Sequence, residues 1–542
     1  MNATATRRSK LSRLGADTFD VVVIGGGING AGIAREAALR GLRTALVDKS
    51  DFAAGTSSRS SKLIHGGVRY LEHGHVGLVL EASRERDLLR RRLAPHLVRP
   101  LPFFFPVFRQ SPVGLWKLRA GLLAYDLLAA FRNIRRHRSY DAAATLRLEP
   151  ELRSEGLVGG ALYYDCITDD ARLVLETILA AEHAGAVCLN YVALESFEKS
   201  DGRISGARLR DVDGGGTLRV AARSVVNATG PWLDRIRALD DPSAPPILRP
   251  TKGVHIVVPR ERVGNRHAVV LHAVRDRRVL FAIPWDDQAL IGTTDTDFTG
   301  SPDEVSVEAE DVDYLLETAN FHFPRARLVA GDIVSAFAGL RPLVAAGEGV
   351  QPSALSREEE LLESRSGLVS LGGGKLTTYR RVAIRVVDRL ASELEARHGV
   401  RARRKSGTNR LPLPGAEGAS TADSEGADSV IRFLGSRYGS RAREILARIE
   451  GAPDLAKPIG PKSPDLRAEA WYGAAAEMAI RVEDVLRRRT QVALRSVEAA
   501  ATAADDVAGL MAEPLGWDRA TVRRRAAEYD GAEDDSPARR KA

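Results

Sequence analysis

A nucleotide-binding turn near the N-terminus constrains the fold of this chain more than any other feature. Residues 20–24, DVVVI, predict a buried strand, and Gly25, Gly27 and Gly30 follow at GxGxxG spacing. In such a turn the glycines permit, in order, the tight bend, the approach of a pyrophosphate and close packing of helix on strand. An Ala-rich helix over residues 30–40 then presents its N-terminus to the phosphates.

A second strand and an acidic residue complete the βαβ unit. Gly41 ends the helix, residues 43–48 predict the next strand, and Asp48 stands at its end. An acid at this position accepts hydrogen bonds from an adenosine ribose and disfavours the 2′-phosphate of NADP. The unit therefore predicts a dinucleotide site, and by itself it leaves NAD and FAD open.

The composition is that of a large globular chain. It has 542 residues, 44% of them hydrophobic, which predicts two to four domains. Cys166 and Cys188 show no metal or redox spacing, so we expect unpaired thiols, a reducing and cytoplasmic compartment, and no bound metal. Residues 1–18 are basic but lack an apolar signal core, which predicts a flexible tail.

The charge of the chain points to an anionic partner. A formal net charge of +8 fits anionic lipid, an anionic substrate or nucleic acid. Zinc-finger spacing, RNP motifs and aromatic stacking series are all missing from the sequence, so we do not expect a nucleic-acid partner.

The most apolar segment, residues 113–131, predicts one amphipathic helix. Lys117, Arg119 and Asp126 interrupt it, and a basic run over residues 132–138 follows. A membrane-spanning helix needs about 18 or more apolar residues in succession, so none is expected. Two alternatives stay open: a helix lying at the membrane interface, or an ordinary helix whose apolar face packs into the core.

Further elements are predicted along the rest of the chain. Asp169 and Asp170 begin a helix that runs to about residue 183, and residues 227–232, NATGPW, form a glycine turn. Residues 250–345 predict an antiparallel substrate sheet, and the glycine run 372–374 opens a helix over residues 375–398. The expected strands are residues 187–189, 192–197, 204–209, 218–226, 254–258, 279–283, 289–292 and 368–371.

The C-terminal part of the chain has a different pattern. Residues 400–428 are rich in Gly, Ser, Ala, Pro and charge, which predicts a linker or a surface excursion. Residues 429–530 predict a helical domain, and residues 531–542 predict a disordered tail.

Several motifs occur in an order that is typical of one enzyme family. After GxGxxG come GTSSRSSKLIHGG, NATGPW, TKGVHIVVP, IPW with IGTTDTDF, GLRPL and GGGKLTTYR. Over about residues 18–400 this order resembles the FAD-dependent glycerol-3-phosphate dehydrogenases of the quinone-linked, aerobic type. RVEDVLRRRT, at residues 481–490, resembles their late helical motif.

The resemblance implies a three-part fold. An α/β Rossmann-like FAD-binding domain is expected to carry an antiparallel-sheet substrate domain of the glycine and D-amino-acid oxidase kind, followed by an α-helical C-terminal domain. The implied FAD-binding segments are residues 19–75, 160–235 and 335–400, and the implied substrate segments are residues 76–159 and 236–334.

The resemblance also implies a reaction. The enzyme would oxidise sn-glycerol 3-phosphate to dihydroxyacetone phosphate with FAD as cofactor and pass the electrons to a membrane quinone. It would be peripheral at the inner leaflet of the cytoplasmic membrane, and a homodimer is a further possibility. The alternatives are a glycerol-3-phosphate oxidase that uses oxygen, a catalytically idle flavoprotein subunit, and a flavin-dependent RNA-modifying enzyme.

Three residues in the motifs are candidates for catalysis. Arg341 and Lys375 are expected to contact the substrate phosphate or alcohol, since basic side chains suit a small anion. Arginine keeps its proton, so Arg341 is predicted to act electrostatically. His255 is the better candidate base near neutral pH, with a purely structural hydrogen-bonding role as the alternative.

Further residues are matched to the family motifs. Arg69, Tyr70 and His65 are expected on the substrate side, as is Arg357, although the family usually has aspartate where this chain has Glu358. A solvated charge run is therefore the alternative for Arg357. The expected cofactor-binding residues are Gly25, Gly27, Gly30, Asp48, Thr56, Ser57, Ser61, Val192, Gly230, Gly374, Leu376 and Thr377.

Overall fold

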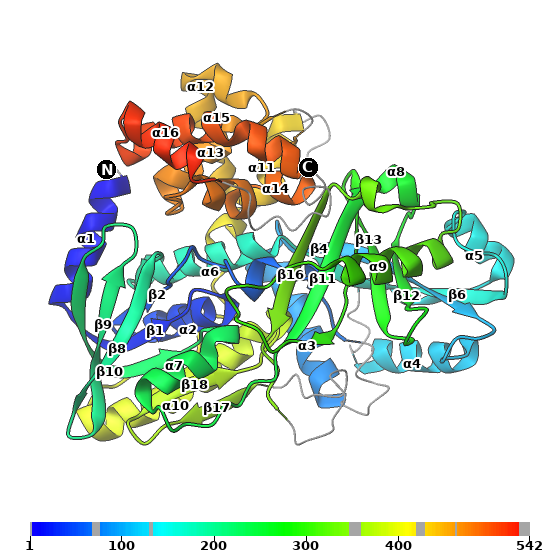
Figure 1. The fold of residues 1–542 in the computed structure, drawn as a ribbon. Coiled ribbons are helices and arrows are strands. Elements are labelled where there is room, and N and C mark those ends of the chain that lie inside the picture. Colours follow the sequence, from blue (N-terminus) through cyan, green and yellow to red (C-terminus); the bar gives the residue numbers. More distant parts are fainter. Residues whose placement is uncertain are drawn as a thin grey trace.

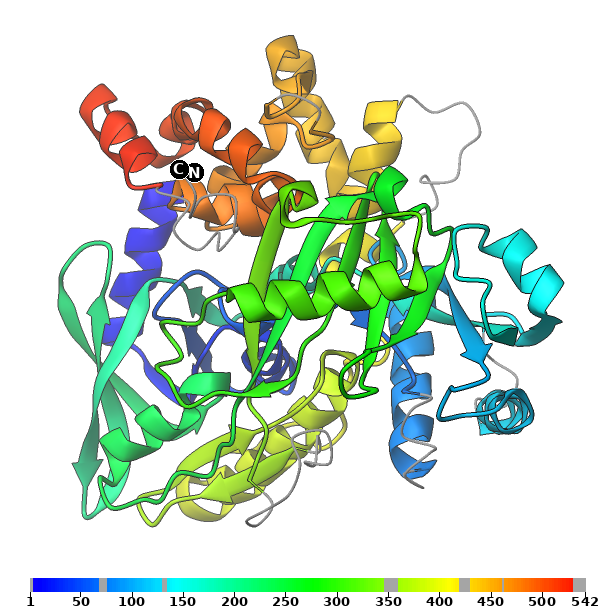
Figure 2. The ribbon, with the colours of Figure 1, turned by 45° about the vertical axis from the view of Figure 1, so that its right-hand side comes forward.

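The computed structural model describes residues 3–67, 76–128, 134–345, 359–418, 429–460 and 463–529. This part of the chain contains two β-sheets that lie side by side, with the C-terminal helices above them in the view of Figure 1. Figure 2 shows the same arrangement turned, with the second sheet brought forward.

The first sheet is built around β1 (Thr18–Ile24), the strand before the glycine turn. β1 pairs in parallel with β2 (Thr44–Val47) on one side and with β10 (Thr217–Asn227) on the other. The order is β17-β18-β10-β1-β2-β7, and β9 joins β10 to β8. The other strands are β7 (Val187–Leu189), β8 (Val192–Ser200), β9 (Arg203–Asp211), β17 (Glu360–Glu363) and β18 (Leu368–Gly372).

Both faces of this sheet are covered, which explains the uninterrupted apolar run in β1. On one face α2 (Ile28–Leu39), α6 (Asp170–His183) and α10 (Tyr379–His398) share a core with Val21 and Val23. On the other face the β8–β9 hairpin and α1 (Ala3–Ala16) pack against the alternate side chains of β1.

The second sheet is mainly antiparallel and runs β15-β11-β14-β13-β12-β4-β6-β3, with β16 paired to β11 and β5 paired to β6. α9 (Ala309–His322) packs on one face, and α4 (Leu115–Leu128) packs on the other. Its strands are β3 (Leu63–Ile64), β4 (Arg99–Phe108), β5 (Arg138–Asp141), β6 (Leu157–Ile167), β11 (Thr251–Pro259), β12 (Ala268–His272), β13 (Val279–Trp285), β14 (Gln288–Gly292), β15 (Thr296–Asp297) and β16 (Ser335–Arg341). α5 (Ala142–Leu148) and α8 (Arg260–Val263) also pack on this sheet, and α3 (Val76–Leu88) lies beside α4. α7 (Leu233–Asp240) packs instead against β18 and β8 of the first sheet.

The C-terminal helices form their own cores and dock on the first sheet's helices. A buried ion pair between Arg172 of α6 and Glu477 joins the two parts. The helices are α11 (Ser429–Tyr438), α12 (Ala442–Gly451), α13 (Arg467–Ala476), α14 (Val492–Arg495), α15 (Val497–Leu515) and α16 (Arg519–Ala527), with a π-helical turn, η11, at Asp484–Arg489.

The expectation of a flexible N-terminal tail is wrong for α1. Leu14 is buried, the Thr4 hydroxyl donates to the Leu515 carbonyl at 2.6 Å, and Arg7 pairs with Asp211 at 2.8 Å. These contacts tie the helix both to the C-terminal domain and to the first sheet (Figure 1). The basic side chains of α1 therefore serve as anchors.

Three of the expected segment boundaries and the expected linker are also corrected. β3, β6 and β16 belong to the second sheet, although the sequence places them in FAD-binding segments. The expected linker is a docked excursion as far as residue 418, because the Leu413 amide donates to the Leu93 carbonyl at 2.8 Å and Leu413 is buried. Residues 419–428 and the tail 531–542 lie outside the described residues.

The apolar segment after residue 113 forms α4, whose apolar side chains are divided between the core and the surface. Leu118 and Leu122 are buried against the second sheet, whereas Trp116, Leu123 and Leu127 are 77%, 50% and 54% exposed. In the described part of the chain, no helix has the length and apolar character that a membrane span requires. Both cysteines of the chain are buried and unpaired.

Candidate functional site

The glycine turn adopts the geometry that a dinucleotide site needs. Gly25 has φ +108°, and a Cβ on Gly30 would lie 1.8 Å from the Gly25 carbonyl oxygen. A Cβ on Gly25 would itself lie 2.6 Å from the carbonyl oxygen of Ala228, which leads into the NATGPW turn and Gly230. The turn therefore accepts glycine only, and it packs directly against the second predicted cofactor segment.

The Asp48 side chain lies beside the glycine turn. Its Oδ2 accepts a hydrogen bond from the Gly26 amide at 2.6 Å, and its Oδ1 accepts one from the Ser50 amide at 2.8 Å. Burial raises the pKa of Asp48 to about 6, although these amide hydrogen bonds act in the opposite direction. The Val192 amide donates to the Asp48 carbonyl at 2.7 Å, so the two residues expected near adenosine are neighbours.

A second glycine turn, at Gly373 and Gly374, lies against Asn29 at the start of α2. The Asn29 side-chain amide donates to the Gly373 carbonyl at 3.2 Å, and a Cβ on Gly374 would lie 2.7 Å from Asn29 Nδ2. Asn29 Oδ1 is buried and has no hydrogen-bond partner in the described structure. A cofactor that carries amide or hydroxyl donors between two helix N-termini fits this unpaired acceptor and the two glycine turns, as FAD would.

The hydroxyl loop after Gly55 joins the cofactor side to the second sheet. Ser57 Oγ accepts from the Ile28 amide at 3.0 Å, at the start of α2. The Thr56 hydroxyl donates to the Leu340 carbonyl at 2.6 Å, and Ser61 Oγ lies 2.9 Å from His255 Nε2. The loop thus contacts both the start of α2 and the two strands that carry Arg341 and His255.

Arg341 ends β16 with its guanidinium held on the second sheet. Its Nη2 donates to Thr293 Oγ1 and to the Thr294 carbonyl, both at 3.1 Å, and its Nη1 pairs with Asp295 Oδ1 at 3.1 Å. The side chain is 24% exposed. A guanidinium that is fixed by several acceptors and partly open to solvent suits the recognition of a small anion.

His255 is a buried neutral imidazole close to that guanidinium. It lies on β11 and stacks on Phe337 with ring centroids 5.0 Å apart. Burial first, and then the positive charges of Arg341 and Lys62, lower the pKa of His255 to about 3. Its Nδ1 is buried without a hydrogen-bond partner among the described residues.

The other predicted site residues fall into two groups. The His65 amide donates to the Thr377 hydroxyl at 3.2 Å, which brings the hydroxyl loop next to the segment that carries half-buried Lys375 and Leu376. Gly230 has φ +57°, and a Cβ added there would meet nothing within 4 Å, so its left-handed backbone is the constraint at this position. Arg69, Tyr70 and Arg357 lie outside the described residues.

Sequence reasoning missed two groups that surround the predicted residues. Thr293, Thr294 and Asp295 hold Arg341, and their signal was an acid and hydroxyls inside IGTTDTDF, a motif to which no role was assigned. Lys62 and Asp170 form an ion pair of 2.7 Å with 1% and 0% exposed side chains.

Comparison with known proteins agrees with this geometry. Residues 20–380 match the family described as FAD dependent oxidoreductase, and residues 406–522 match the C-terminal domain of alpha-glycerophosphate oxidase. Glycerol-3-phosphate dehydrogenase 2 of Mycobacterium tuberculosis is 40% identical over 97% of this chain and 90% of that protein.

Two solved structures carry the likeness into three dimensions. The glycerol-3-phosphate dehydrogenase of Bacillus halodurans, solved in complex with FAD, has a TM-score of 0.80 at 32% identity and covers 99% of both chains. The glycine oxidase of Geobacillus kaustophilus has a TM-score of 0.52 at 22% identity, covers 69% of this chain and 94% of its own, and shares the fold. The chain is therefore a flavoprotein that belongs to the FAD-dependent glycerol-3-phosphate dehydrogenase family.

Proposed function

We propose that this enzyme oxidises sn-glycerol 3-phosphate to dihydroxyacetone phosphate and passes the electrons to a membrane quinone. The observation that carries the proposal is the fixed Arg341 guanidinium beside the neutral imidazole of His255. The cofactor-binding loop contacts His255 through Ser61 and contacts Leu340, the neighbour of Arg341, through Thr56. The substrates named for the relatives support the same reaction.

In this proposal Arg341 and Lys375 bind the anionic substrate. Arg341 keeps its proton, so it stabilises negative charge that develops on the alcohol oxygen during oxidation. Its hydrogen bonds to Thr293 and Thr294 fix the direction of the fork before substrate arrives. Arg69, Tyr70, Arg357 and His65 are proposed as further substrate contacts.

His255 is the proposed acceptor of the hydroxyl proton. Its lowered pKa keeps the ring neutral at physiological pH, but also makes the imidazole a weaker base than a free histidine. A bound dianionic phosphate would offset the positive charges of Arg341 and Lys62 that lower this pKa, and so strengthen the base. Ser61, at 2.9 Å from Nε2, orients the ring. When bound, FAD would supply the two-electron redox chemistry that links the alcohol carbon to the quinone, which the protein's own side chains do not provide.

The exposed face of α4 supports a membrane acceptor. Trp116, Leu123 and Leu127 project from a helix that also carries Lys117 and Arg119. Apolar side chains flanked by cations are typical of helices that lie in the interface of an anionic bilayer. We propose that α4 rests on the inner leaflet of the cytoplasmic membrane, where a quinone is accessible.

Anaerobic flavin reduction tests the substrate and the acceptor separately. We expect sn-glycerol 3-phosphate to bleach the flavin absorbance of the purified holoenzyme without any added acceptor. A quinone analogue should then restore the absorbance rapidly, and oxygen should do so slowly. Failure to bleach would contradict the substrate, whereas rapid reoxidation by oxygen with peroxide release would establish the oxidase alternative.

A further inference from the structure

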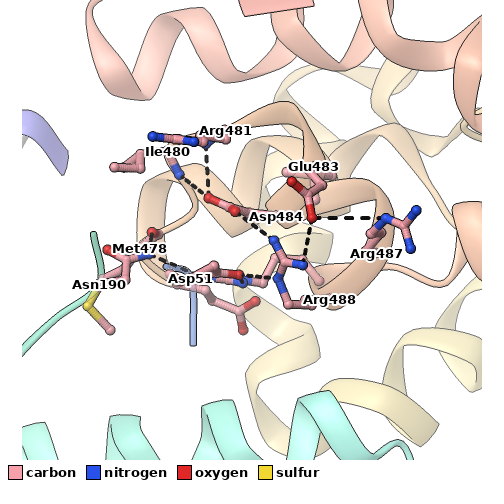
Figure 3. Close-up of polar contacts among 12 residues, drawn as sticks. Asp51, Asn190, Met478, Ile480, Arg481, Glu483, Asp484, Arg487 and Arg488 are labelled. Atoms are coloured by element: carbon pink, nitrogen blue, oxygen red, sulfur yellow. Dashed lines mark hydrogen bonds and ion pairs between the residues drawn. The ribbon is translucent and has the colours of Figure 1, made fainter. Parts of the chain in front are cut away.

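The loop that follows Asp48 and contains Asp51 and Phe52, here called the Asp48 loop, is anchored to the C-terminal domain through the buried carboxylate of Asp51. Asp51 is 0% exposed, and Arg488 Nε donates to its Oδ2 at 2.6 Å (Figure 3). Arg489 Nη2 donates to Oδ1 at 3.0 Å, and the Asn190 side-chain amide donates to the same oxygen at 2.9 Å. A buried charge is costly unless it is paired and hydrogen-bonded in this way.

The same loop lies against the glycine turn. Asp48 holds the Gly26 amide through its side chain, and the Ala53 amide donates to the Gly26 carbonyl at 3.1 Å. The ring of Phe52 fills the space beside Gly26, where a Cβ would lie 2.6 Å from Cδ1. Asp51 therefore sits between Asp48, the expected ribose ligand, and the residues that back the pyrophosphate turn.

The C-terminal domain also contacts Tyr191, the residue before Val192. The Tyr191 amide donates to the Ser50 carbonyl at 2.9 Å, and the Tyr191 hydroxyl donates to Asp484 Oδ1 at 2.6 Å. Arg488 links this second contact to Asp51, because its Nη2 donates to Asp484 at 3.0 Å (Figure 3). One arginine thus connects both segments expected to surround adenosine.

We propose that Asp51 is a positioning residue for FAD and that Arg488 and Arg489 of the C-terminal domain act through it. A buried ion pair is a weak source of stability but an effective means of fixing one geometry, which the Asp48 loop requires. The C-terminal domain thereby supports the cofactor site through Asp51. This inference concerns the cofactor alone, so it stands or falls independently of the proposed substrate and acceptor.

FAD titration of the full-length apoprotein tests the proposal. For Asp51→Asn we expect the dissociation constant of FAD, measured from the quenching of FAD fluorescence, to rise at least tenfold. The increase in melting temperature on saturation with FAD should shrink correspondingly, because ligand stabilisation follows affinity. Arg488→Lys keeps the charge but loses the fork, so it should weaken binding in the same direction and by less.

Glu477→Gln is the matched control. Glu477 and Arg172 form a buried ion pair between the same two domains, and both side chains are 0% exposed. The Glu477 side chain makes no hydrogen bond or ion pair with the Asp48 loop in the described structure. Its backbone carbonyl accepts from Arg489, and its partner Arg172 donates to the Arg489 carbonyl at 3.0 Å. This variant should lower the melting temperature of the apoprotein and leave FAD affinity unchanged.

The outcomes separate positioning from mere stability. Wild-type FAD affinity in both Asp51→Asn and Arg488→Lys would overturn the proposal, as would an equal loss of affinity in Glu477→Gln. If Asp51→Asn does not fold as an apoprotein, Arg488→Lys decides: weakened FAD binding with a nearly unchanged apoprotein melting temperature supports the proposal, and unchanged binding overturns it.

Discussion

Replacing Gly253 by alanine would move the Arg341 guanidinium without removing any functional group from the site. A Cβ on Gly253 would lie 2.6 Å from Arg341 Nη2, 2.8 Å from Nη1 and 2.7 Å from Thr293 Oγ1. Gly253 lies on β11 two residues before His255, so the added methyl group points to the face that carries the imidazole. The atoms that it meets are the ends of side chains, so we expect the guanidinium to move and the backbone to stay.

The size of the displacement follows from contact distances. Ordinary contact with a Cβ begins at 3.4 Å, so Nη2 must retreat by roughly 0.8 Å from its position at 2.6 Å. The hydrogen bonds of 3.1 Å to Thr293 and Thr294 would then be broken or bent. Misplacement of a positioning group by about 1 Å costs about 100-fold in rate, which equals about 3 kcal/mol of transition-state stabilisation.

The assay is steady-state kinetics with sn-glycerol 3-phosphate and a quinone analogue, together with flavin content. We expect kcat/KM of Gly253→Ala to fall about 100-fold while the protein keeps its flavin and nearly its full melting temperature. Gly331→Ala is the control, because a Cβ there has nothing within 4 Å and Gly331 has no left-handed backbone. Unchanged kcat/KM in Gly253→Ala would refute the reasoning that Arg341 must occupy its observed position.

Three further predictions concern the base, the cofactor turn and the membrane face. His255→Asn should lower kcat by about 100-fold or more with flavin retained. The same variant should also show a weaker pH dependence of the free energy of unfolding, measured by denaturant titration. In the wild type the pKa of His255 is about 3 in the native state and about 6.5 in the unfolded state, so only the unfolded state gains a proton as pH falls from 6.5 to 5, which costs about 2 kcal/mol of stability. Gly30→Ala, with its Cβ 1.8 Å from a carbonyl oxygen, should yield protein without flavin absorbance, and a yellow variant would contradict the rigid turn. Leu127→Glu should weaken sedimentation with anionic vesicles several-fold without slowing flavin reduction, whereas Val329→Glu, at a similarly exposed residue, should leave binding unchanged; equal binding by both variants would argue against α4 as the membrane face.

Much of the fold could be predicted because it depends on local patterns. The strand at 20–24, the helix after it and the strand that ends near Asp48 occur as β1, α2 and β2. The helix predicted from Asp170 to about residue 183 is α6, with the Asp169 carboxylate capping it through the Arg172 amide. These signals are a strand's apolar run, a helix cap and a turn glycine, each read within a few residues.

Assignment of strands to sheets could not be predicted in the same way. β16 follows the expected substrate segment directly, yet its Arg341 pairs in register with Thr251 of β11, about ninety positions earlier in the chain. The sequence shows that a segment is a strand, but its hydrogen-bonding partner is chosen by the packing of the whole domain. The helical nature of α1 was missed for a related reason, because its stability comes from docking on the first sheet and α15.

The sequence by itself determined the cofactor turn, the family and the residue types available for chemistry, because GxGxxG geometry and ordered motifs are local properties of the chain. Only the tertiary structure decided the state of those residues. The pKa of His255 is lowered because folding buries it beside Arg341 and Lys62, and Asp51 acquires its role because residues more than four hundred positions away supply its arginines. Desolvation and charge pairing depend on which distant side chains meet in space, and no local pattern contains that information.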